Sequence, residues 1–217
     1  MSSSAEPSAP RALEQRAFDE WPTALRALFD GTELATKVGF TASLMTNGAG
    51  GHIRASLLGI GELYAPDSRC LAFSLWPTSR AARTLSSAVS SAGESAAAIA
   101  DAGAAARAHT IQSHGDRRRT LAALTFVHGG AFYQVQLSVE KLGGAEGAAE
   151  PGNTLAHFVG SIETGEAQQV GYAHLTSGIT FELAGERAAR EAVLDRWQRQ
   201  IEALRQATHA WLAGGRC

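Results

Sequence analysis

Two neighbouring stretches decide the fold: Leu71 to Leu85, LAFSLWPTSRAARTL, and His52 to Tyr64, HIRASLLGIGELY. In HIRASLLGIGELY, Arg54 and Ser56 are two residues apart in a strand-like run, so their side chains point to the same face. In the other stretch, an apolar run ends at the turn Trp76-Pro77, and Thr78-Ser79-Arg80 then begins a predicted helix. The N-terminus of a helix favours an anion, because its backbone N–H groups are free and its dipole is positive there. Both stretches are thus predicted to carry phosphate-binding groups.

The order of these pieces resembles the FMN-binding split-barrel proteins related to pyridoxamine 5'-phosphate oxidase. In that family a strand arginine reaches the FMN phosphate, and a later strand-to-helix junction reading roughly F-x-x-x-x-x-S-R-K-A holds the flavin. The corresponding residues here run from Arg54 to Leu58 and from Phe73 to Ala82. The resemblance implies a mainly β, α+β fold, a six-stranded antiparallel split β-barrel with flanking helices. It also implies a homodimer with FMN between the subunits, and FMN-binding residues Arg54, Ser56, Phe73, Ser74, Leu75, Ser79 and Arg80.

Two departures from the family pattern bear on activity. Ala81 and Gly59 stand where the oxidase has lysines, and the chain ends AWLAGGRC instead of the Arg-Leu-x-Pro close. Arg83, one helical turn beyond Arg80, is a candidate replacement for the lost charge. We therefore expect an FMN-dependent oxidoreductase acting on an unidentified small molecule, and not a true pyridoxamine 5'-phosphate oxidase. The alternative is a non-catalytic sensor or binding module that holds a flavin, haem or another cofactor, and no catalytic acid or base can be named.

Each group also has an ordinary structural interpretation. Arg54 and Arg80 could be exposed charges, Thr78 and Ser79 could simply cap a helix, and Trp76 could pack at a turn instead of beside a flavin. The occurrence of all of these groups in the family's order favours the functional interpretation.

The composition of the chain argues against several classes of function. A formal net charge of −2 over 217 residues gives no reason to expect nucleic acid or an anionic membrane as a partner, since both require a basic face. The two cysteines do not suggest a disulfide framework, and the seven histidines show no metal-ligand spacing. The N-terminus lacks the apolar core of a signal peptide, and no run is long enough to span a membrane. We expect a cytoplasmic protein with no metal, no nucleic acid and no membrane partner.

The domain prediction is a disordered lead at 1–10 and one split-barrel domain at 11–217. The domain is expected to contain an Ala/Ser/Gly-rich insertion at about 86–119, either surface filler or a lid, and a C-terminal helix at about 186–212. Further predictions are one or two helices over 11–29, strands over 36–46, 53–64, 121–127 and 131–142, a helix over 154–162 and a strand over 179–183.

A dimer is also favoured by apolar patterning. One strand face carries Tyr133, Val135, Leu137 and Val139, and the C-terminal helix has Trp197 and Trp211 on one stripe. These side chains are expected to exceed what a small barrel covers alone.

Overall fold

The computed structural model describes residues 13–48, 51–87, 120–143 and 155–214. The predicted lead, most of the insertion at 86–119 and most of the loop at 143–152 lie outside these residues.

An antiparallel sheet dominates the described structure. Its strands are β1 (Leu13–Phe18), β2 (Thr41–Asn47), β3 (Ile53–Gly59), β4 (Leu63–Tyr64), β5 (Cys70–Leu75), β6 (Thr120–His128), β7 (Ala131–Lys141) and β8 (Ala156–Val170). The helical elements are α1 (Thr23–Leu28), the 3-10 turns η1 (Leu34–Lys37) and η3 (Ile60–Glu62), a helix at 80–87 and α3 (Arg187–Ala213).

The strand order shows why this sheet is a split barrel. The order is β3-β2-β6-β7-β8-β5-β4, and β1 adds to β8 outside this path. The two ends of the path, β3 and β4, are joined in the chain by η3 alone. The sheet therefore curls until its end strands come near each other without forming a ladder. The predicted fold class is confirmed, with eight strands instead of six.

The inner face of the curled sheet carries the core. Leu58 of β3, Leu44 of β2 and Leu124 of β6 lie on this face and are at most 2 % exposed. On β7 the alternation places Val135, Leu137 and Val139 inward, and all three are buried. These residues belong to one core cluster that also includes side chains from α1, η3 and α3.

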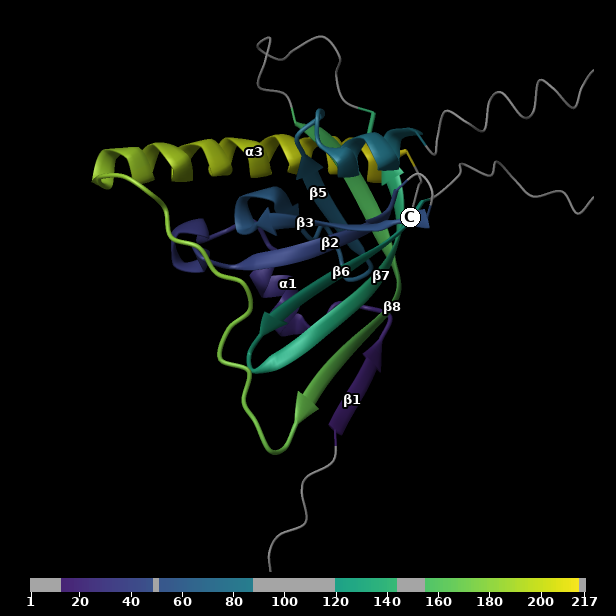
Figure 1. Ribbon diagram of the computed structural model, residues 1–217. Coiled ribbons are helices and arrows are strands. Elements are labelled where there is room, and N and C mark those ends of the chain that lie inside the picture. The colour runs from purple at the N-terminus through teal and green to yellow at the C-terminus, as the bar shows by residue number, and fades with distance from the viewer. Residues whose placement is uncertain (1–12, 49–50, 88–119, 144–154, 215–217) are drawn as a thin grey trace, which may run out of the picture.

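Helix α3 lies across one end of the sheet, while β1 and the far half of β8 extend from the other end (Figure 1). Trp197 and Ile201 of α3 pack over Gly61 and Gly31, where a Cβ atom would lie 2.4 Å and 2.6 Å from their side chains. The Arg205 guanidinium stacks over the Tyr64 ring at 5.3 Å. The predicted C-terminal helix is confirmed, and its Trp197 and Trp211 are buried within the chain.

Three local predictions are wrong. Residues 13–18 form strand β1 instead of a helix, and residues 156–162, within the helix predicted at 154–162, belong to the 15-residue strand β8. Residues 179–183 have no regular structure; they belong to an irregular segment from 171 to 186 that reaches α3. This segment is held by the Thr41 hydroxyl, which donates to the Ile179 carbonyl, and by Phe181, whose ring packs edge-on to Trp197.

Candidate functional site

Arg54 and Ser56 share the inner face of strand β3, as the alternation predicts. Arg54 pairs with Thr46 and Ser56 with Leu44, and these β2 residues are buried on the core side. Along the inner face of β3, exposure rises from buried Leu58 through half-buried Ser56 to exposed Arg54. Arg54 therefore lies at the mouth of the curled sheet, where a solute can reach its guanidinium.

Strand β5 places its three predicted site residues on two different faces. Phe73 and Leu75 point inward, and the Phe73 ring stacks on Phe158 with 5.5 Å between centroids. Ser74 points to the outer face, and Phe73, Ser74 and Leu75 are each at most 4 % exposed. The side chains of Phe73 and Leu75 are committed to the core, so these two residues can offer a ligand only their backbone.

The Ser74 side chain bonds to a residue that the sequence prediction did not include. Its hydroxyl lies 2.9 Å from Nδ1 of His157, its direct partner on β8. Burial lowers the pKa of His157, which favours the neutral imidazole. The only signal in the sequence is a histidine in an apolar run, and this signal does not reveal its cross-strand partner.

The turn after β5 leads into the helix at 80–87. The Ser79 amide donates to the Trp76 carbonyl at 2.8 Å, and the Ser79 Oγ accepts the Ala82 amide at 3.1 Å. Ser79 is thus the N-cap, which confirms the structural interpretation, and its hydroxyl still has a proton to donate. The cap leaves the Arg80 and Ala81 amides without intrahelical acceptors, so the helix start suits an anion.

Two exposed side chains flank this helix start. Arg80 is exposed at its first position, and the Trp76 side chain just before the turn is 47 % exposed. Arg83 is also exposed. By contrast, Ala81 is buried at 3 % exposure. Cationic groups at this junction therefore come from the two arginines.

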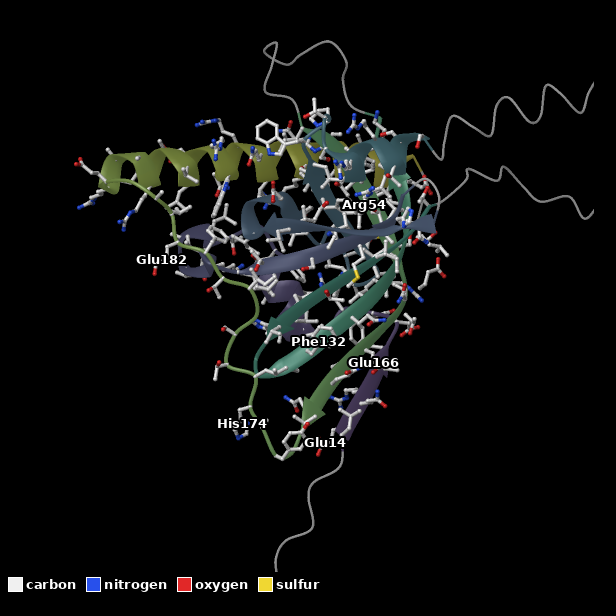
Figure 2. All side chains as sticks on the ribbon, viewed as in Figure 1. Glu14, Arg54, Phe132, Glu166, His174 and Glu182 are labelled. Atoms are coloured by element: carbon white, nitrogen blue, oxygen red, sulfur yellow. The ribbon has the colours of Figure 1, made fainter. Side chains whose placement is uncertain are left out.

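The two phosphate-binding candidates lie far apart along the sheet path, since Arg54 lies on its end strand β3 whereas Ser79 and Arg80 follow β5, which is next to the other end. In the view of Figures 1 and 2, Arg54 lies at the same end of the molecule as the helix at 80–87. The curl of the sheet thus places both at one end of the barrel.

A second surface lies on the outer side of β2, β3 and β6. Pairing places on it an uncharged set that we call the outer apolar face: Ile53, Ala55, Leu57, Met45, Leu121 and Ala123. Ile53, Leu57 and Leu121 are 72 %, 55 % and 65 % exposed. Strand β3 also ends the path of the sheet, so its far edge carries no ladder to another described strand. The side chains predicted to drive dimerisation, from Tyr133 to Val139 on β7 and the α3 tryptophans, pack in the core instead.

Residues 13–48, 51–87, 120–143 and 155–214 contain no group of three or more His, Cys, Asp or Glu side chains that could hold a metal ion. No helix among the same residues is long and apolar enough to cross a membrane.

No protein-family model matches the chain, and neither does any curated protein. Solved structures do match. One is a Clostridium acetobutylicum protein related to general stress protein 26 of B. subtilis, of the pyridoxinephosphate oxidase family. It is 12 % identical, with a TM-score of 0.35, over 72 % of this chain and 94 % of its own. Another is a proposed 5-nitroimidazole antibiotic resistance protein from Bacteroides thetaiotaomicron, 5 % identical, with a TM-score of 0.37, over 78 % of this chain and 97 % of its own.

The first of these neighbours comes from the family that the sequence resembles. Both TM-scores are below 0.5, so these structures do not establish the fold. The split barrel is identified by the strand order of this chain.

Proposed function

We propose that the protein is a cytoplasmic FMN-binding oxidoreductase, with the cofactor phosphate held at the mouth of the split barrel. The observation that carries this proposal is the pair Arg54 and Ser56, which share the inner face of β3 just where that face opens to solvent. An exposed guanidinium beside a hydroxyl is a donor set that suits a phosphate monoester.

The helix start supplies the other half of the proposed phosphate site. The Ser79 hydroxyl, the free amides of the first turn and the Arg80 guanidinium are all donors, and no carboxylate belongs to this set. Donors alone suit a ligand group that carries about −1.5 to −2 charges at neutral pH. The residues present therefore fit the phosphate of FMN.

For the flavin ring we propose the backbone of Phe73, Ser74 and Leu75 together with the exposed ring of Trp76. The indole could stack on the isoalloxazine, since it is the half-exposed aromatic side chain of this turn. When bound, FMN supplies the redox chemistry, and this chain's residues bind it, orient it and limit the access of water.

We further propose that two copies of the chain pair through the outer apolar face. Three exposed aliphatic side chains without a charge among them, next to a sheet edge, are typical of a surface that another protein covers. A second copy presents the same face, so a two-fold arrangement buries both faces at once.

The alternative function is a flavin or haem sensor without turnover. It is favoured by the absence of cations at the two positions where the resembled oxidase has lysines: Ala81 is buried and Gly59 leads into η3. The protein would then hold its cofactor without a group to assist reduction.

The test starts from the colour of the purified protein. After incubation with FMN and gel filtration we expect a yellow protein whose flavin bleaches when NADPH is added without oxygen. Bound flavin that dithionite bleaches and NADPH does not supports the sensor. A colourless protein that takes up no FMN contradicts both, and a red-brown protein indicates haem.

A further inference from the structure

Gly48, in the turn between β2 and β3, has no local reason to be glycine. Its amide donates to the His52 carbonyl at 2.9 Å, and its carbonyl accepts the Gly51 amide at 3.1 Å. Gly51 has a φ of +77°, whereas Gly48 is not among the residues with positive φ. The φ of Gly48 therefore does not require glycine.

The space beside Gly48 is bordered by the Arg54 side chain and by the His52 carbonyl oxygen. A Cβ atom on Gly48 would lie 3.3 Å from the Arg54 Nε, 3.4 Å from the His52 carbonyl oxygen and 3.6 Å from the Arg54 Cδ. Nonbonded heavy atoms prefer a separation of about 3.5–4.0 Å. The Arg54 side chain thus folds back over the turn and occupies the space that a side chain at Gly48 would need.

We infer that Gly48 is a positioning residue for Arg54, because its missing side chain lets the guanidinium lie over the turn at the barrel mouth. This inference rests on the proposed function, in which Arg54 binds the FMN phosphate. An arginine ordered before its ligand arrives loses less conformational freedom on binding. Gly48 therefore sets the orientation of the guanidinium without touching the ligand.

A graded series at one position tests this role. Gly48→Ala and Gly48→Val place one and then three carbons in the space that Arg54 uses, and the exposed arginine arm can yield without unfolding the sheet. Gly143→Ala is the matched control, because Gly143 also lacks a positive φ and a Cβ there would meet nothing within 4 Å.

We expect FMN affinity to fall in the order wild type, Gly48→Ala, Gly48→Val, approaching the loss of about tenfold or more caused by Arg54→Ala. Riboflavin, which lacks the phosphate, should bind all variants alike. In an Arg54→Ala background the Gly48 substitutions should have no further effect on FMN. Equal FMN affinity in wild type and both Gly48 variants, or an equal loss with Arg54 already removed, would overturn the inference.

A readout without ligand separates this inference from the proposed function. The Nε–Hε resonance of Arg54 can be assigned in the NMR spectrum of the free protein by its loss in Arg54→Ala. It should shift in Gly48→Ala and stay in place in Gly143→Ala. If it shifts while wild type binds no FMN, the positioning role stands and the proposed function fails. If it stays in place in both Gly48 variants, Gly48 does not position Arg54, whatever the protein binds.

Discussion

Ser74 and His157 face each other across the β5–β8 pair, with the Ser74 Oγ 2.9 Å from Nδ1 of His157. The bond lies on the outer face of the sheet, opposite the inner face that carries Phe73. It joins two residues that are 83 positions apart in the chain. The Ser74 hydroxyl therefore stabilises the fold, and a cofactor at the barrel mouth would meet this residue through its backbone.

The buried imidazole predicts a pH-dependent stability. Burial lowers the pKa of His157 in the folded protein below its usual value of 6.5. Below about pH 6.5 the unfolded chain thus binds more protons than the folded one, so stability is lost as the pH falls. We expect the free energy of unfolding in urea to decrease more between about pH 7.5 and about pH 5.5 in wild type than in His157→Gln.

The comparison isolates His157, because His128, whose pKa is also lowered by burial, is present in both proteins. His174→Gln, an exposed position in the segment before α3, is the control. Equal slopes for wild type and His157→Gln would mean that His157 does not titrate as its burial requires.

The packing of Trp197 against Gly61 leaves no room for a side chain at position 61. A Cβ atom on Gly61 would lie 2.4 Å from Trp197 Cγ, and the indole is held in turn by Phe181. Gly61→Ala should therefore destabilise the protein by about 1–3 kcal/mol through overpacking. Thermal unfolding against the open-site control Gly143→Ala measures this, and a melting temperature equal to that of the control is incompatible with the described packing.

The outer apolar face predicts where a dimer would break. Leu57→Glu puts a charge on that face, so sedimentation should change from dimer to monomer at micromolar concentration. Leu13→Glu, on strand β1 and 50 % exposed in wild type, should leave the dimer intact. A wild-type monomer that still binds FMN would remove the proposal of pairing, and a dimer that survives Leu57→Glu would place the interface elsewhere.

Local sequence patterns predicted the helices and strands that are determined by residues close together in the chain. The β6–β7 hairpin follows from alternation and from Gly129 and Gly130, which both adopt positive φ. Helix α3 follows from helical spacing. Strand β8 was missed because Phe158, Val159 and Gly160 are all buried, so its first half shows no alternation.

Strand β1 depends on a residue far away in the sequence. Its LEQRAF favours a helix, yet Phe18 pairs with Gly165, where a Cβ atom would lie 2.1 Å from the Phe18 ring. Likewise, the shared face of Arg54 and Ser56 follows from the two-residue period of a strand. Whether Arg54 and Ser56 approach Ser79 and Arg80 depends on how far the sheet curls. The curl cannot be predicted from any short stretch of the sequence.

In the proposed function, Arg54 and Arg80 bind one phosphate. Each arginine replaced by alanine should weaken FMN binding by about 1.5–3 kcal/mol, the range for a hydrogen bond to a charged group. Arg16→Ala, an exposed arginine on the edge strand β1, is the matched control and should bind like wild type.

The most direct measurement is a fluorescence titration of wild type, Arg54→Ala, Arg80→Ala and Arg16→Ala with FMN and with riboflavin. We expect Arg54→Ala and Arg80→Ala each to lose FMN affinity by about ten- to 150-fold while riboflavin affinity stays unchanged. Unchanged FMN affinity in both variants, or an equal loss for FMN and riboflavin, would contradict a phosphate site made of Arg54 and Arg80.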